Sequence, residues 1–154
     1  MSFEVDISKW AAKSSRQMGD LHRAVCLKLF NRVIMATPVG NPDNWKSLWK
    51  WDDGTAVNPP EGYVGGRLRG NWQISSDTPA SGTVEIIDPE GTKTTAKVEH
   101  FILSKDFKKD IEIYLTNNLP YAYTVEYDGH SGQAPEGMVR NNLIRITNNL
   151  KSQA

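Results

Sequence analysis

The sequence of 154 residues predicts an α+β fold, with a long N-terminal helix and a C-terminal helix packed on a mainly antiparallel sheet of about four strands. Apolar residues at helical spacing near both ends predict the helices, and alternating apolar and polar residues in the middle predict the strands. Turn clusters separate these segments. A chain of this length buries roughly two thirds of its unfolded surface, which is enough for a single domain over residues 1–154.

The first predicted element is a helix from residue 6 or 8 to about residue 36. Apolar residues recur along it at helical spacing: Ile7, Trp10, Ala11, Met18, Leu21, Val25, Leu29 and Val33. Gly19 lowers the helix propensity by about 1 kcal/mol relative to alanine. Thr37 ends the helix because a residue before proline is disfavoured in the helical region. Cys26 lies in this pattern and is expected to be buried as a small apolar residue.

Residues 41–63 are predicted to form an inserted loop that is rich in tryptophan. Its turn clusters enclose several large apolar side chains: Trp45, Leu48, Trp49 and Trp51. A flexible linker does not ordinarily carry so much apolar area, so we expect an ordered loop. Two roles stay open, because the tryptophans either cover their own domain or dock against a partner.

Four segments are predicted to be strands: residues 68–75, 83–87, 111–116 and 121–127. In the first strand, Arg67 and Arg69 lie on the face opposite Leu68. The last two strands are separated by a short turn and predict an antiparallel hairpin. Glu126 alternates with apolar neighbours and is expected to face solvent. The larger aromatic residues of these strands are expected in the core: Trp72, Tyr114 and Tyr123.

Two more helices complete the predicted fold. Asp88 followed by Pro89 is typical of a helix start, so residues 89–107 predict the second helix. The last helix is predicted from residue 135 or 136 to about residue 150, where apolar residues again recur at helical spacing.

The chain lacks the residue patterns of a metal, nucleotide or nucleophilic site. Its three histidines are scattered, and none belongs to a cluster with zinc spacing. The glycine-rich segment 63–70 lacks the Lys-Ser/Thr of a phosphate loop and precedes a predicted strand, so we interpret it as a hinge. His130 and Ser131 are better explained as a polar turn than as a catalytic pair. We therefore expect no cofactor, no metal and no catalysis.

The charge and hydropathy of the chain argue against two further classes, a subunit that grips double-stranded DNA over its whole surface and a membrane-spanning or exported protein. Lys+Arg and Asp+Glu both number 18, and there is no continuous basic run that would follow a nucleic-acid backbone, although a ring of subunits could present local rows of arginine. There is no run of 18 consecutive apolar residues and no basic start followed by an apolar run, so we expect neither a membrane span nor a cleaved signal.

Short motifs occur in a fixed order along the chain. They are Thr37-Pro38-Val39, Gly66-Arg67-Leu68-Arg69-Gly70-Asn71-Trp72, Pro120-Tyr121-Ala122 and Val125-Glu126-Tyr127, followed by the ending Gln133-Ala134-Pro135-Glu136-Gly137-Met138-Val139-Arg140. Together they resemble the tail-completion (neck, head-to-tail joining) proteins of long-tailed bacteriophages, the lambda minor tail protein Z-like family. The chain departs from the family pattern in an insertion at 40–65 and in Asp128, which precedes Gly129.

The resemblance implies a non-enzymatic virion protein of the tail and neck, assembled in the host cytoplasm. It implies a homo-oligomeric ring, a hexamer, between the tail tube and the head connector, with other neck and tail-tube proteins as partners, DNA passing through the ring lumen, and no membrane contact. Subunits of such a ring meet through heterologous contacts. The residues expected at subunit or partner interfaces are Arg67, Arg69, Glu126, Tyr127, Trp45, Trp49 and Trp51.

Two other function classes stay open. A carbohydrate-binding module would use Trp45, Trp49 and Trp51 to stack on sugar rings. A small cell-wall hydrolase would need two carboxyl groups roughly 5 to 9.5 Å apart in a cleft. A monomer in solution favours either of these classes, and a ring favours the neck protein.

Overall fold

The computed structural model describes residues 3–45 and 50–152, and residues 3–6 as backbone only. Its helices are α1 (Phe3–Ala36), α3 (Arg67–Gly70), α4 (Thr92–Ser104), α5 (Ala122–Tyr127) and α6 (Val139–Lys151), with a 3₁₀ turn, η1 (Pro42–Asn44). Its strands are β1 (Gln73–Ser76) and β2 (Ile113–Thr116). The mixed helix and strand composition and the long N-terminal helix confirm those parts of the predicted fold.

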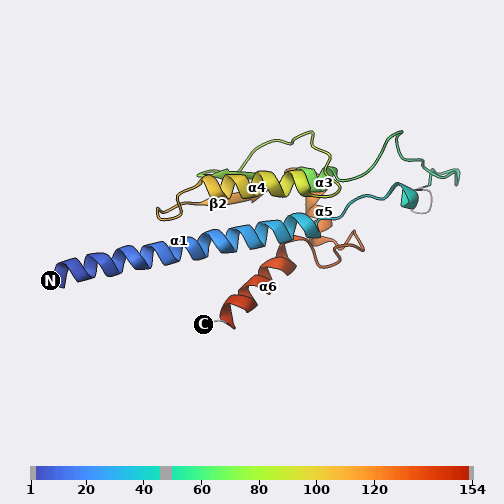
Figure 1. Cartoon of the computed structure of the whole chain (residues 1–154). Helices are drawn as coiled ribbons and strands as arrows, with labels where there is room; N and C mark the ends of the chain where they lie inside the picture. Colours follow the sequence, from blue (N-terminus) through green and yellow to red (C-terminus); the bar gives the residue numbers. More distant parts are fainter. Residues whose placement is uncertain (1–2, 46–49, 153–154) are drawn as a thin grey trace.

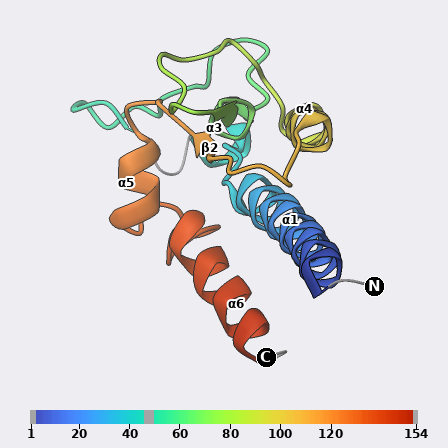
Figure 2. The same ribbon diagram turned by 90° about the vertical axis from the view of Figure 1, so that its left-hand side faces the viewer.

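Helix α1 is the long helix against which α4 and α6 pack (Figure 1). Helix α4 packs beside its C-terminal half, with the small sheet next to α4, and α6 packs against α1 from the other side (Figures 1 and 2). The N-terminal part of α1 extends beyond this body at one end. The loop after η1 extends beyond it at the other.

The face of α1 that the core buries is not the stripe that predicts the helix. Cys26, Val33 and Ile34 are buried, and Leu27 and Phe30 pack against the same core. Of the predicted stripe, only Val33 is fully buried. The helix therefore has two apolar faces, and the prediction followed the one that the core leaves largely uncovered.

Gly19 marks the place where α1 meets the segment between α4 and β2. A Cβ at Gly19 would lie 2.5 Å from the carbonyl oxygen of Phe107, so glycine permits this close approach. His22 packs edge-on against the ring of Phe107, and Arg23 donates a hydrogen bond to the carbonyl of Lys105 at 3.1 Å. These contacts anchor the middle of α1 to the body.

The described residues contain one antiparallel sheet of two strands, in which Gln73 pairs with Thr116 and Ser76 with Ile113. The prediction of about four strands is therefore not confirmed. Residues 83–87 form no strand because they lie against α3. The backbone N–H of Val84 donates to the side chain of Asn71 at 2.9 Å instead of to a neighbouring strand.

Residues 121–127 were predicted as the second strand of a hairpin, and this prediction is wrong. The segment forms α5, which begins at Ala122. Ala122, Val125 and Glu126 are buried, at the spacing of one helix face. The alternating tyrosines that favoured a strand lie outside this face, and Tyr123 and Tyr127 are exposed.

The other two predicted helices are present with shorter bounds. α4 begins at Thr92 and not at Pro89, because the chain turns at Gly91, whose φ is 77°. α6 begins at Val139, after a turn through Gly137 with a φ of 87°. Both helices end within a few residues of the predicted positions.

Trp72 and Cys26 are buried, as predicted. The indole Nε1 of Trp72 donates to Oγ1 of Thr37 at 2.7 Å, and that hydroxyl donates to the carbonyl of Val33 at 2.8 Å. These two hydrogen bonds satisfy the indole N–H of Trp72 and the hydroxyl of Thr37, which the core encloses. No helix within the described residues is long and apolar enough to cross a membrane.

Candidate functional site

Arg69, one of the predicted interface residues, is used inside the chain. It lies in α3, and its Nη2 donates to the carbonyls of Thr37 at 2.8 Å and Met35 at 3.1 Å. Its Nη1 donates to the carbonyl of Pro89. The last carbonyls of a helix have no partner within the helix and carry partial negative charge, so a cation stabilises them. Arg69 therefore caps the C-terminal end of α1.

Gly66 allows α3 to approach the start of α4. Its φ is +87°, and a Cβ there would lie 2.3 Å from the nitrogen of Pro89. The glycine-rich segment leads into a short helix and not a strand, which corrects the sequence interpretation. The buried carboxylate of Asp88 accepts hydrogen bonds from the N–H and hydroxyl of Thr94 at 2.8 and 2.7 Å. Burial lowers the pKa of Arg69, and the charges of Asp88 and Glu90 oppose that shift.

Glu126 is a buried structural residue, and the expectation that it faces solvent is wrong. It is 6% exposed. Its Oε2 accepts hydrogen bonds from the backbone N–H of Met138 at 2.6 Å and Val139 at 2.9 Å. Its Oε1 accepts from the backbone N–H and Nε of Arg140 at 3.0 and 3.2 Å. The carboxylate thus satisfies the unpaired donors at the start of α6.

The charged form of Glu126 is favoured by these contacts. Burial raises the pKa of its carboxyl group, but the hydrogen bonds from Val139, Arg140 and Met138 outweigh burial. The net result is a pKa below the ordinary value of 4.5. The carboxylate therefore stays ionised at neutral pH and keeps α5 joined to α6.

Arg67 and Tyr127 lie at the surface, as an interface role requires. Nη2 of Arg67 is 2.9 Å from Oε1 of Glu85 in an exposed ion pair. Tyr127 packs against Tyr123 with ring centroids 4.6 Å apart, and the guanidinium of Arg140 lies 4.8 Å from its centroid. Tyr123 was predicted in the core, but it is 67% exposed. α5 therefore presents an aromatic pair to solvent.

The loop tryptophans have different environments. Trp45 packs edge-on against Tyr63, with ring centroids 5.1 Å apart. Trp51 is 63% exposed, and Trp49 lies outside the described residues. Beyond η1, the described part of the loop has one isolated bridge, between Lys50 and Ala56. The predicted interface residues thus lie on α3, α5 and the loop, and the described structure does not gather them into one cleft.

The arm, which we define as residues 7–21 of α1, carries a surface that the interface prediction did not include. Its large apolar side chains are exposed: Ile7 by 48%, Trp10 by 70%, Met18 by 69% and Leu21 by 52%. We call these four residues the arm stripe. Its signal was in the sequence, since Ile7, Ala11, Ser14, Met18, Leu21 and Val25 alternate spacings of four and three residues, as in helix pairs.

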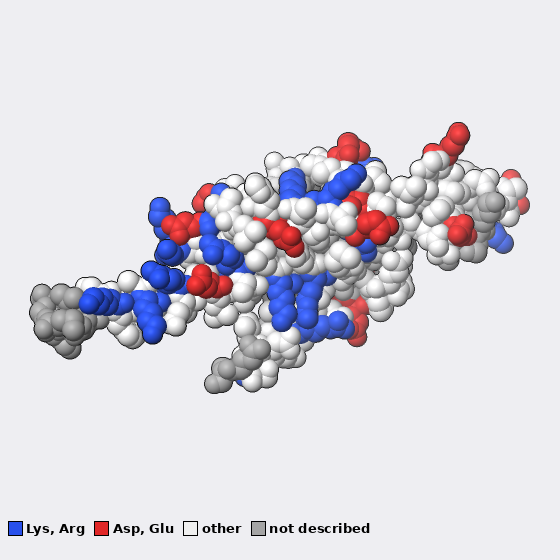
Figure 3. Space-filling model, viewed as in Figure 1, with Lys and Arg blue, Asp and Glu red and all other residues white. Residues whose placement is uncertain are grey.

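The arm and the outer loop, which we define as residues 50–64, lie at opposite ends of the molecule and carry opposite charge. Residues 7–21 have three basic residues and one acidic residue, Lys9, Lys13, Arg16 and Asp20, and two further acidic residues, Glu4 and Asp6, precede them in the same helix. The outer loop has three acidic residues and one basic residue, Asp52, Asp53, Glu61 and Lys50. Figure 3 shows basic side chains along one end and mainly acidic ones at the other. The outer loop also exposes apolar surface through Trp51 and Val64.

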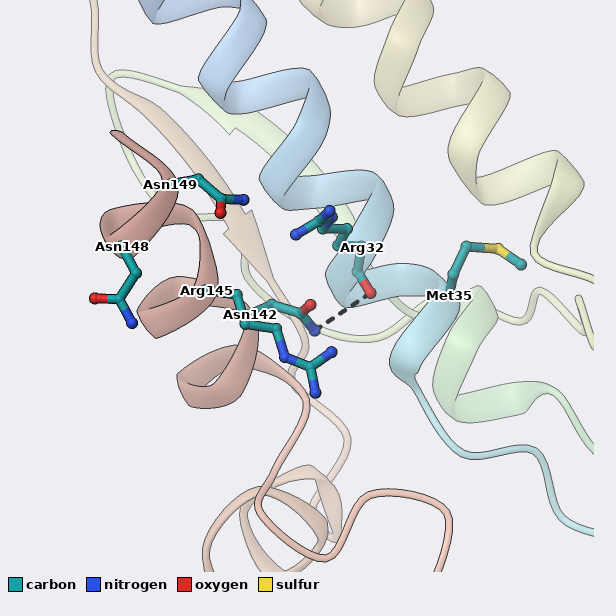
Figure 4. Close-up of a pocket in the computed structure, with 6 residues that line it drawn as sticks. All are labelled: Arg32, Met35, Asn142, Arg145, Asn148 and Asn149. Carbon is teal, nitrogen blue, oxygen red and sulfur yellow. Dashed lines mark hydrogen bonds between the residues drawn. The ribbon is translucent and has the colours of Figure 1, made fainter. Parts of the chain in front are cut away.

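A groove of about 590 Å³ lies between α1 and α6 (Figure 4). The residues that line it are Arg32, Met35, Asn142, Arg145, Asn148 and Asn149. None of these side chains is acidic. No interface or catalytic prediction included them, because the two helices that provide them are far apart in the sequence.

The described residues contain no group of three or more His, Cys, Asp or Glu side chains that could hold a metal ion. Cys26 is buried and free of disulfides, and burial raises the pKa of its thiol. A raised pKa lowers the thiolate fraction at neutral pH, so this thiol is a weak nucleophile.

We compared the chain with protein-family models, curated proteins and solved structures, and none of the three comparisons gave a match. Membership of the tail-completion family therefore stays a prediction from the motifs of the sequence.

Proposed function

We propose that the chain is a structural virion protein, a ring-forming tail-completion subunit that joins the tail tube of a phage to the head connector. The observation that carries this proposal is the pair of complementary surfaces at opposite ends of the molecule. The arm bears the arm stripe together with Lys9, Lys13 and Arg16, and the outer loop is acidic and bears Trp51. The order of the sequence motifs supports the same function.

Two different surfaces at opposite ends favour a head-to-tail contact between copies. When the arm of one copy meets the outer loop of the next, basic groups face acidic groups across the rim of the contact. A contact of arm against arm would instead bring Lys13 and Arg16 of both copies together, and these would repel each other. A two-fold dimer in which each arm lies on the partner's outer loop uses the same surfaces as a ring, and the number of chains in the assembly distinguishes the two. Head-to-tail contacts close into rings when the rotation between copies permits it.

The exposed apolar area is large enough to contribute substantially. Trp10 and Trp51 would together bury roughly 300–500 Å². A standard interface buries roughly 800 Å² on each partner. The remaining arm-stripe residues and Val64 add further apolar area around these two side chains.

The test compares two substitutions on opposite sides of the arm. Trp10→Glu places a carboxylate in the arm stripe, and Ala12→Glu places the same charge on an exposed position outside it. Native mass spectrometry should find a ring of about six chains for the unmodified protein and the Ala12→Glu variant, and smaller species for Trp10→Glu. Separately purified heads and tails should fail to join when the Trp10→Glu variant is supplied, and should join with the Ala12→Glu variant.

The results separate this function from its alternatives. A protein that remains a monomer over the micromolar range and is dispensable for joining heads to tails contradicts the proposal. If that monomer binds a polysaccharide column and Trp51→Ala abolishes retention, the carbohydrate-binding module takes its place.

A further inference from the structure

The groove between α1 and α6 brings together two arginines for which the fold provides no partner. Among the described residues, Arg23, Arg67 and Arg140 lie within ion-pair distance of carboxylates, and Arg69 caps α1. The side chains of Arg32 and Arg145 form no ion pair and no hydrogen bond with any residue that the structure describes. Both line the groove, Arg32 from α1 and Arg145 from α6 (Figure 4).

A buried asparagine holds the two helices together. Asn142 is 6% exposed. Its Nδ2 donates to the carbonyl of Met138 at 2.8 Å and reaches the carbonyl of Arg32 at 3.5 Å. This amide ties α6 to the turn of α1 that carries Arg32. The relative position of the two arginines is therefore set by a buried contact between their helices.

The chemistry of the lining selects an anion. Two guanidinium groups line the groove and no carboxylate does, so the lining favours an anion. Guanidinium forms paired hydrogen bonds to phosphate oxygens, and the side chain of Asn149, which points toward α1 (Figure 4), offers an amide donor on the same side of α6. Lys28 lies one helical turn before Arg32, is exposed, and extends the basic row along α1. Figure 3 shows basic side chains gathered over this part of the body.

The shape of the groove favours a polymer over a small molecule. Small ligands usually have most of their surface buried in a concave pocket, whereas three residues that line this groove, Arg145, Asn148 and Asn149, are exposed to solvent. A polyanion can lie across an open groove and gain affinity from successive phosphates. We propose that the Arg32–Arg145 groove binds the phosphodiester backbone of a nucleic acid, without reading its sequence. This property does not require a ring, because each copy carries the groove.

The test is the fluorescence anisotropy of a labelled DNA duplex of about 20 base pairs, titrated with protein at several salt concentrations. The variant Arg32→Gln/Arg145→Gln removes two charges from the groove. The control Lys93→Gln/Lys97→Gln removes two charges from exposed positions of α4. Far-ultraviolet circular dichroism and thermal unfolding verify that both variants fold.

We expect the groove variant to bind at least tenfold more weakly than the unmodified protein, and the slope of log K against log salt to fall by about two. The control should change affinity by less than threefold. Equal losses in both variants, no binding of the unmodified protein at 50 mM salt, or competition by inorganic phosphate as effective as by DNA phosphate would each overturn the proposal.

The same titration in the Trp10→Glu background keeps the two proposals distinguishable. If the ring is lost while a single copy still binds DNA through Arg32 and Arg145, the groove stands without the ring. If native mass spectrometry detects the ring but the groove variant binds DNA as well as the unmodified protein does, the groove proposal alone fails.

Discussion

The carboxylate of Glu126 lies 3.2 Å from Nε of Arg140 and also accepts the backbone N–H of that residue at 3.0 Å. One buried side chain of α5 therefore supplies the cap that α6 does not have from its own N-cap residue, Met138. The junction depends on a charge from the preceding helix, 13 residues before the start of α6.

Glu126→Gln should destabilise the protein by about 1–3 kcal/mol, because the amide loses the negative charge and places donors opposite the N–H groups of α6. Urea unfolding at pH 7 measures this loss. Glu136→Gln, at an exposed position in the same segment, is the matched control and should change stability by less than about 0.5 kcal/mol. Equal effects of the two substitutions would show that the cap is unimportant.

The contribution of Glu126 should also depend on pH. Its pKa in the folded chain is below the ordinary value of 4.5, so the unfolded chain binds the proton more readily. The stabilisation is present in full above the unfolded pKa and is lost as the pH falls through the folded pKa. The difference in unfolding free energy between the unmodified protein and Glu126→Gln should therefore shrink on acidification below about pH 4.5. A difference that stays constant down to pH 2.5 contradicts this assignment.

Arg69→Ala should reduce stability by about 1–3 kcal/mol, since it leaves the carbonyls of Met35 and Thr37 without their charged donor. Arg67→Ala, two residues away in α3, is the matched control. Its ion pair with Glu85 is exposed and should contribute no more than about 1 kcal/mol. Thermal unfolding of both variants distinguishes the structural arginine from the surface one. A larger loss for Arg67 would be inconsistent with the contacts described.

Gly66→Ala should cost about 2–4 kcal/mol, combining an unfavourable φ with a clash against Pro89. Gly62→Ala isolates the backbone term, because Gly62 has a φ of +73° but nothing within 4 Å of an added Cβ. It should cost about 1 kcal/mol. Denaturant midpoints compare the two, and similar losses at both positions would rule out the close approach to Pro89.

Trp51→Ala should leave the free energy of unfolding within about 0.5 kcal/mol of the unmodified value, because this side chain is exposed. The same substitution should shift the oligomer to smaller species in sedimentation velocity. Trp72→Ala, in the core, should instead lose about 3–5 kcal/mol. A large loss of stability in monomeric Trp51→Ala would mean that the outer loop covers its own domain.

The three long helices, α1, α4 and α6, were predictable because their signals are local. Helical spacing of apolar residues and the proline after Thr37 suffice for α1, and Asp88 marks the start of α4 within a few residues. α5 was mistaken for a strand because alternating tyrosines fit both states in a short segment, and its burial of Glu126 against α6 decides between them. Residues 83–87 likewise depend on contacts with α3.

The candidate surfaces divide in the same way. Trp51, Arg67 and Tyr127 were expected at interfaces and lie at the surface, but residue type alone does not decide this, because Tyr123 was expected in the core and is exposed. Arg69 and Glu126 could not be assigned correctly, because their partners are backbone groups of elements distant in sequence. The groove was also beyond prediction, since Arg32 and Arg145 meet only after α6 packs on α1.

Helix α1 runs without interruption from the arm to Ala36, a length of about 51 Å for its 34 residues. Contacts of Gly19 and Arg23 hold the middle of α1 on the body, so the arm is a rigid helical projection and not a flexible linker. A surface that is ordered before contact loses little conformational entropy when a neighbour covers it. Because the same rod carries Arg32 beyond that anchor, the angle at which a neighbour holds the arm also sets the direction in which the groove of that copy faces.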